Sequence, residues 1–245
     1  MGLTIHYKLK FHSEHAYIED LQARWLVEEA RKLAFSFKRK GRVDGVGPLV
    51  EGWAARKLGE DYIEYRHPEY GKQWTEVLPV RAWMFVVEVG RDCEPLRLGL
   101  CQYPARVRHL GGERATRLSK GWWLAAFSKT QFASLHGWEH FRRCHTAVID
   151  LLHALRGLGF RVEISDEGDY WPGRSLTKLR AEVGMMNGVV AAAAGALKDL
   201  DEAVNGKSGV ESPIFAHKNF ERLEAEGAAR VGPALRQLQK VLGRE

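Results

Sequence analysis

Acidic and aromatic side chains gather at the end of a predicted strand, in the segment VEISDEGDYWPGR at positions 162–174. Asp166, Glu167 and Asp169 carry hard oxygen ligands of the kind that bind Mg²⁺. Carboxylates in such a position can also transfer protons or pair with a cation. The segment therefore marks a candidate site, and its three carboxylates are the predicted metal ligands.

A second polar loop, SKTQF, ends another apolar strand and supplies Lys129, Thr130 and Gln131. The two strands are separated by one helix, and such a βαβ unit has parallel strands that end at the same edge of the sheet. Open α/β sheets usually bind ligands in the crevice outside those ends. We therefore expect the two loops to lie side by side, with His145 beneath them on the inward face of the helix.

These loops supply the candidate catalytic and ligand-binding residues. The catalytic candidates are Lys129, His145, Asp166 and Glu167. The ligand-binding candidates are Lys129, Thr130, Gln131, Tyr170, Trp171 and Arg174. A structural interpretation remains open, in which the carboxylates cap or solvate the loop, Lys129 forms a salt bridge, and the rings cover the core edge. His145 taken alone is most often a hydrogen-bonded core histidine.

A weaker motif, HGWEH at positions 136–140, matches the HxxEH pattern of some zinc enzymes. In that pattern His136 and His140 bind the metal from one helical face and the glutamate acts as general base. Here the motif falls at a helix start with Gly137 inside it, and no third ligand is fixed by the sequence. Zinc is therefore a minor alternative to magnesium.

Other catalytic templates are missing from the sequence. There is no phosphate-binding P-loop, no GxGxxG after a strand and no G-x-S-x-G elbow. The three cysteines show no metal-ligand spacing, and an odd number of them favours free thiols in a reducing compartment.

Hydrophobic periodicity predicts an α+β fold around the candidate site. Residues 3–11 alternate as a half-buried strand does, an amphipathic helix leads to Lys40, and residues 138–158 form a second helix. With the apolar strands between and after them, the order β, α, β, β, α, β describes a mixed sheet with a βαβ unit. It is also the order of a ferredoxin-like fold. The turn-rich residues 41–79 are predicted to be an insertion with a hairpin that turns at 67–71.

A long helix is predicted for residues 175–204, with apolar side chains at alternating steps of three and four. This a/d spacing is typical of helices that pack along a seam. The seam can pack against the rest of the chain, or it can bind a protein partner or a second copy. Residues 205–213 have linker composition. We therefore divide the chain into an α+β domain, 1–204, and a linker with a helical appendage, 205–245.

The chain has 245 residues and a formal net charge of +6, with Lys and Arg concentrated in two stretches, 31–42 and 105–120. A solvated helix end and a solvated loop explain these stretches, and binding of nucleic acid is the alternative. No stretch approaches the ~20 apolar residues of a membrane span. We expect a cytoplasmic protein with no membrane association.

The segments TIHYKLKF, GLCQYP, FSKTQFAS and DEGDYW resemble those of an uncharacterised group of hypothetical bacterial proteins. The resemblance covers most of residues 1–204. It implies a bacterial, cytoplasmic origin and carries no activity.

The lack of a specific catalytic motif beside a long interaction helix favours a ligand-binding or partner-binding accessory protein. The alternative is a metal-dependent phosphoester hydrolase, nuclease-like, in which Asp166, Glu167 and Asp169 bind Mg²⁺ and Lys129 stabilises developing negative charge. A further alternative is nucleic-acid binding without catalysis, through the two basic stretches.

Overall fold

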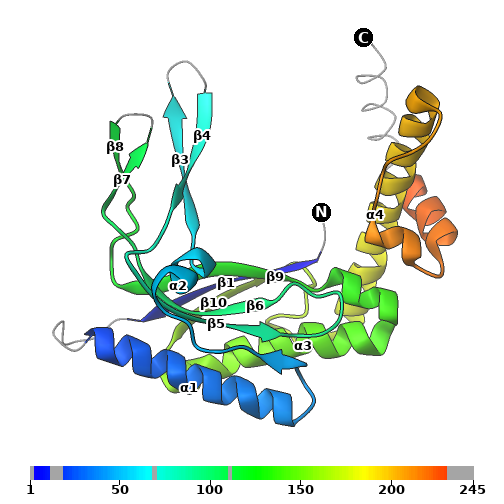
Figure 1. Ribbon diagram of the computed structural model, residues 1–245. Helices are drawn as coiled ribbons and strands as arrows, with labels where there is room; N and C mark the ends of the chain where they lie inside the picture. The colour runs from blue at the N-terminus through cyan, green and yellow to red at the C-terminus, as the bar shows by residue number, and fades with distance from the viewer. Residues whose placement is uncertain (1–2, 12–18, 68–70, 110–111, 231–245) are drawn as a thin grey trace.

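The computed structural model describes residues 3–11, 19–67, 71–109 and 112–230 (Figure 1). Within them, a six-stranded sheet has two helices on one face, and two hairpins and a short helix on the other. The predicted α+β class is therefore confirmed.

The sheet has the strand order β10-β1-β9-β6-β5-β2, and its neighbouring pairs are antiparallel. Its strands are β1 (Thr4–Phe11), β2 (Gly45–Val46), β5 (Arg81–Glu88), β6 (Leu96–Gln102), β9 (Trp122–Lys129) and β10 (Arg161–Asp166). Because β9 and β10 are both antiparallel to β1, they run parallel to each other. The predicted βαβ unit is therefore present, with β1 lying between its two strands.

Helices α1 (Glu19–Arg39) and α3 (Trp138–Ala154) cover one face of the sheet (Figure 1). Helix α1 buries a stripe of small and branched side chains at helical spacing and places acidic residues in its first turn and basic residues in its last. These charges suit the helix dipole. Helix α3 continues into the 3-10 turn η3 (Leu155–Leu158) and ends at Gly159, whose φ of 104° favours glycine.

Four strands, β10-β1-β9-β6, form the ferredoxin-like part of the sheet. Strands β1 and β6 are parallel to each other because both are antiparallel to β9, just as β9 and β10 are parallel across β1. The sheet therefore contains two βαβ units, one made of β1, α1 and β6 and the other of β9, α3 and β10. In each unit, a strand of the other unit lies between the two parallel strands. Between α1 and α3 the chain contributes three long strands to the main sheet, β5, β6 and β9, where the predicted order has two. Strand β5 widens the sheet towards β2.

The alternation of β1 separates the chemistry of the two faces. Ile5, Tyr7 and Leu9 are buried against the helices, whereas His6 and Lys8 point to the opposite side. We call that opposite side, which α1 and α3 leave uncovered, the open face.

Two hairpins project on the side of the open face (Figure 1). They are β3 (Asp61–His67) with β4 (Gly71–Val77), and β7 (Arg106–His109) with β8 (Gly112–Ala115). The hairpin predicted to turn at 67–71 is confirmed, and its tip at 68–70 lies outside the described residues. The basic stretch 105–120, expected to be a loop, contains the β7–β8 hairpin instead. Strand β8 is exposed throughout, so its sequence lacks the apolar alternation that reveals a strand.

The remainder of the predicted insertion, 41–79, joins the main sheet at its edge. Strand β2 pairs with β5, and Val50 forms an isolated bridge with Met84. Helix α2 (Gly52–Leu58) lies against β5 on the open face, where its Ala55 is buried.

The long helix α4 (Leu176–Asn205) begins at Ser175, whose hydroxyl accepts a hydrogen bond from the backbone N–H of Lys178. This N-cap satisfies one of the free donors of the first turn. Leu179 and Val183 then join the main core. The first half of the predicted a/d seam therefore packs against the α+β domain.

The second half of α4 holds the C-terminal segment, which consists of η4 (Pro213–Ala216) and a helix over residues 220–230. A small separate apolar cluster is formed by Ala191, Ala194, Ile214 and Leu223. The far end of the seam stays exposed at Leu197 and Val204. The part of the predicted helical appendage after residue 230 lies outside the described residues, and the division at residue 204 remains a prediction.

In the described part of the chain, no helix is both long and apolar enough to span a membrane.

The contact between α4 and the C-terminal helix depends on Gly227. A Cβ atom at this position would overlap the backbone carbonyl of Gly188, whereas a Cβ at Gly184 would meet open space. We expect Gly227→Ala to weaken this contact by on the order of 1–3 kcal/mol, as overpacking does. Hydrogen exchange followed by mass spectrometry should show lost protection in residues 213–230.

The matched control is Gly184→Ala in α4, the helix that Gly227 contacts. It should leave protection of the C-terminal segment unchanged and stabilise α4 by about 0.5–1 kcal/mol, because alanine is the better helix former. Equal protection in the two variants would contradict the close-approach explanation.

Candidate functional site

The two loops that the sequence places at one sheet edge do lie there. The loop after β9 is tied to the beginning of the chain by the N–H of Thr130, which donates to the carbonyl of Leu3 at 3.2 Å. The loop after β10 is tied similarly, because the N–H of Glu167 donates to the carbonyl of Thr4 at 3.2 Å. The start of β1 therefore lies between the two candidate loops and is hydrogen-bonded to both of them.

A buried polar chain crosses this edge. The Thr130 hydroxyl lies 2.8 Å from Nδ1 of His145, and Nε2 of His145 lies 3.0 Å from Oδ1 of Asp166. The His145 and Asp166 side chains are fully buried, as is Thr130. The chain thus resembles a catalytic triad in composition, but solvent and substrate have no access to its members. Close packing of Gly168 against the His145 ring completes the enclosure.

Asp166 organises the loop that follows it. Its Oδ1 accepts the N–H of Gly168 at 2.8 Å, and its Oδ2 accepts the N–H groups of Tyr170 at 3.0 Å and Trp171 at 2.9 Å. Burial opposes the charged carboxylate, yet the interaction with His145 and these N–H donors outweigh it, so the pKa of Asp166 lies below its ordinary value. The carboxylate therefore holds a turn in place.

A second buried chain fixes Gln131. Its Oε1 accepts the N–H of Leu3 at 3.0 Å, and its Nε2 donates to Oδ1 of Asn187 at 3.0 Å. Asn187 in turn donates from Nδ2 to the hydroxyl of Ser134 at 2.9 Å. This chain ties α4 to η2 (Gln131–His136) and to the start of the sheet. The sequence analysis missed Asn187, although a lone amide on the inner side of an apolar helix is a signal for such a contact.

The three predicted metal ligands have three different sets of partners. Glu167 accepts the N–H of Thr4 at 2.9 Å, with His6 3.6 Å away, and Asp169 pairs with Lys178 at 2.8 Å on the surface. Among the described residues there is no group of three or more His, Cys, Asp or Glu side chains placed to hold a metal ion. The predicted magnesium site thus stays a prediction that the geometry does not support.

The other candidates at this edge have local partners as well. Lys129 lies 3.6 Å from Glu94. The Arg174 guanidinium lies over the rings of Tyr170 and Trp171, at 5.4 and 5.0 Å, and pairs with Asp150. Stacking of this kind stabilises the loop against α3.

The two histidines of the HxxEH motif lie together at the start of α3. Their rings are 5.3 Å apart and perpendicular. His136 pairs with Asp92, whereas Nε2 of His140 lies 3.0 Å from the carbonyl of Arg91 and 3.7 Å from Sγ of Cys144. Each ring thus has its own partner in the β5–β6 turn, and the zinc site remains a prediction as well.

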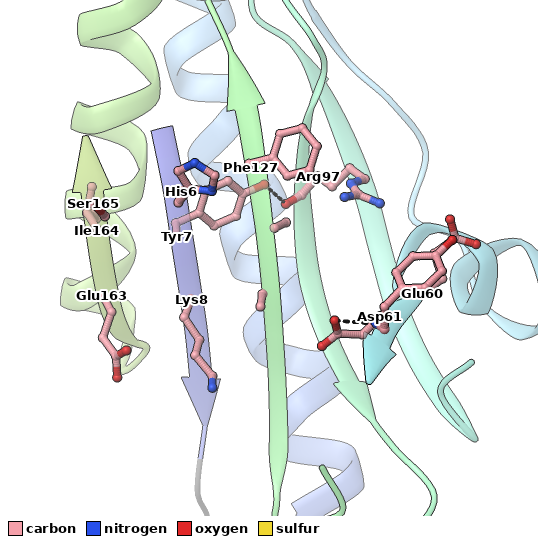
Figure 2. A pocket seen from close by; sticks show the side chains of 13 residues that line it. His6, Tyr7, Lys8, Glu60, Asp61, Arg97, Phe127, Glu163, Ile164 and Ser165 are labelled. Carbon is pink, nitrogen blue, oxygen red and sulfur yellow. Dashed lines mark hydrogen bonds between the residues drawn. The ribbon is translucent and has the colours of Figure 1, made fainter. Parts of the chain in front are cut away.

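A second candidate site, which is concave, lies on the open face. Figure 2 shows strands from β10 to β6 side by side, with side chains that rise from them towards the start of β3. The pocket has a volume of about 750 Å³. Its lining includes His6, Lys8, Tyr62, Arg97, Phe127 and Glu163. The Arg97 guanidinium and the His6 ring each lie 6.0 Å from the Phe127 ring, so a guanidinium, an imidazole and an aromatic ring meet in this pocket.

A second depression of about 550 Å³ continues along β1 and shares Lys8 with the first. Its charged lining residues are Lys8, Lys10, Arg117, Lys120 and Arg161. No acidic side chain contributes to this lining among the described residues, although Lys10 pairs with Glu163 next to it. We call the two depressions together the sheet groove, and its second part is a positively charged surface.

Sequence reasoning did not identify the sheet groove. Of its basic side chains, only Arg117 and Lys120 fall in a stretch that was singled out, 105–120. The available signal was the alternation of β1, in which His6, Lys8 and Lys10 occupy successive positions on one face. The other basic stretch, 31–42, lines neither depression.

No model of a protein family, no curated protein and no solved structure matches this chain. The resemblance to hypothetical bacterial proteins carries no activity either. Functional inference therefore depends on the geometry of the two sites just described.

The buried carboxylate makes a prediction about stability. In Asp166→Asn, the amide nitrogen faces backbone N–H donors, so at least one buried donor loses its acceptor. We expect the free energy of unfolding at pH 7 to fall by about 2–4 kcal/mol. Denaturant unfolding followed by circular dichroism measures this difference.

The pH dependence follows from the lowered pKa of Asp166. Its stabilising contribution is present above the unfolded pKa, near 3.8, and is lost as pH falls through the still lower folded pKa. The difference between Asp166→Asn and the unmodified protein should therefore shrink below about pH 4. The control is Asp169→Asn, whose exposed ion pair should matter little at any pH. Equal losses in both variants would contradict the structural role of Asp166.

Proposed function

We propose that the sheet groove binds single-stranded nucleic acid without catalysing a reaction on it. The observation that carries this proposal is the open sheet face, on which five basic side chains of one depression adjoin the exposed Phe127 and Tyr62 rings of the other. The proposal keeps the expected class of a binding protein and places the ligand on a surface that the sequence analysis did not select.

The basic part of the groove suits a phosphate backbone. Lys8 and Lys10 come from β1, Arg161 from β10, and Arg117 and Lys120 from the segment that follows β8. Their side chains reach the same depression from two strands and one connecting segment. Five cations that reach one depression from three segments favour a polyanion with several phosphates over a single compact anion.

The aromatic part suits unpaired bases. Phe127 is exposed on the floor, Tyr62 stands at the start of the β3–β4 hairpin, and Arg97 lies beside the Phe127 ring. Bases stack on exposed aromatic rings and on guanidinium groups when they are not paired in a duplex. The aromatic side chains therefore support a single strand rather than a double helix as the ligand.

The hydrolase alternative has less support. Its candidate carboxylates point to separate partners, and His145 is enclosed with Asp166 beneath the loop. An accessible general base near a metal ligand set is what such chemistry needs. The carboxylates that line the groove are Glu60, Asp61 and Glu163. Glu163 is paired with Lys10 and Glu60 with Lys57.

Charge neutralisation in the groove tests the proposal. We expect Lys120→Gln with Arg161→Gln to weaken binding of a single-stranded oligonucleotide by about tenfold or more at moderate salt, because two phosphate contacts are lost. The slope of log K against log salt should fall in magnitude by about 0.7 for each lost contact. Fluorescence anisotropy with a labelled strand, repeated at several salt concentrations, measures both quantities.

The control is Lys38→Gln with Lys40→Gln, which removes the same charge from exposed positions at the end of α1, on the other side of the sheet. This variant should bind as the unmodified protein does. A similar loss in both variants would show that net charge alone drives association. Absence of binding by the unmodified protein at low salt would refute the proposed function.

A further inference from the structure

Large aromatic side chains are exposed beyond the sheet groove, on the same side of the sheet. Their exposed fractions are 62% for Trp53 on α2, 51% for Tyr62 on β3 and 60% for Trp74 on β4. We call these three residues the aromatic patch. Rings of this size are usually buried in folded proteins, so a contiguous exposed group of them marks a binding surface.

The hairpin that carries two of these rings has faces of opposite character. In the β3–β4 register, Tyr62 pairs with Glu76 and Glu64 pairs with Trp74, so both rings are on one face. The other face carries Ile63, which packs against the main core, and Thr75, which is buried. The hairpin is therefore held by one face and leaves Tyr62 and Trp74 free on the other.

Lys57 connects Trp53 to this hairpin face. Its Nζ lies 5.5 Å from the centre of the Trp53 ring and 2.8 Å from Oε1 of Glu76, the cross-strand partner of Tyr62. Arg56 also lies over the Trp53 ring, at 5.6 Å. Helix α2 and the hairpin thus present their rings to the same region of the surface.

Three acidic side chains near the patch are paired with lysines, whereas Oδ1 of Asp61 accepts the backbone N–H of Tyr62 at 2.7 Å. Glu60 and Glu76 pair with Lys57 at 3.7 and 2.8 Å, and Glu64 pairs with Lys72 at 3.1 Å. A lysine beside each of these three glutamates reduces their repulsion of an anionic ligand.

Tyr62 belongs to both surfaces, since it also lines the sheet groove with Phe127. We propose that the aromatic patch is a second stacking platform for the strand that lies in the groove, so that the ligand turns from the sheet onto the hairpin and α2. This inference rests on the proposed function. Continuity at Tyr62 and the cations beside Trp53 favour the same strand as the occupant, in place of a protein partner.

The consequence is a dependence on ligand length. A strand of about six nucleotides, which is within the range of site sizes for such surfaces, fills the groove alone. A strand of about twenty nucleotides is long enough to reach the patch as well. Removing the rings of the patch should therefore weaken the binding of the long strand only.

The experiment compares the unmodified protein with a double variant that carries both Trp53→Ala and Trp74→Ala. Labelled oligothymidylates of about six and about twenty nucleotides are titrated, and binding is followed by fluorescence anisotropy. We expect the double variant to lose tenfold or more in affinity for the long strand and to bind the short strand unchanged. Trp53→Phe with Trp74→Phe, which keeps a stacking ring at each position, should restore most of the loss.

The matched control is Trp25→Ala, because Trp25 is 56% exposed on α1 and lies on the opposite side of the sheet. It should bind both strands normally. Unchanged affinity of the double variant for the long strand would overturn the inference and leave the proposed function of the groove intact. Equal losses for both lengths would also overturn it. Failure of the unmodified protein to bind either strand would instead remove the proposed function, and the inference with it.

Discussion

Strand β1 must satisfy two different environments at once, and the rest of the structure depends on this constraint. It pairs with β9 on one side and β10 on the other, so its backbone is hydrogen-bonded along both edges. Its apolar residues belong to the core beneath α1 and α3. Its polar residues run along the groove on the other face. The fold and the proposed binding surface are thus specified by alternate positions of the same eight-residue strand.

The strand-end cluster shows how residues that look catalytic can serve the fold. Thr130, His145 and Asp166 have the types and spacing of proton-transfer groups, yet they are enclosed and connect two loops to one helix. Burial of a charged carboxylate is tolerated here because three backbone N–H groups and a histidine face it. Such a network holds the sheet edge in one arrangement, because an unpaired member inside the protein is costly.

Much of the fold could be predicted from the sequence, because long apolar patterns identify helices and strands. The α+β class, the helix with His145 on its inner face and the common edge of the two loops follow from periodicity and strand polarity. The position of β1 between β9 and β10 agrees with the ferredoxin-like fold that the element order suggests. The element order alone does not fix it, since strand order depends on pairing between distant segments. The groove was missed for the same reason, because its side chains come from segments that meet only in the folded sheet.

The sequence predicts the surroundings of some functional candidates less well than their residue types suggest. Asp166 stands out in a dense acidic segment, but its burial depends on backbone donors that only the turn creates. Trp53 and Trp74 look like core residues by type, and only the packing of α2 and the hairpin shows that they are exposed. Exposure is a property of tertiary packing, so residue type alone gives the wrong expectation for them.

The central place of β1 also has a consequence for how the chain reaches its folded state. Its pairing partners lie roughly 110 to 160 residues later in the chain, so its hydrogen bonds close very long loops and contribute a high contact order. During synthesis the strand leaves the ribosome long before β10 is made. Until then its apolar face and its free backbone edges are open to other chains. The nascent protein is therefore expected to depend on protection of β1, and the sheet can be completed only when β10 arrives.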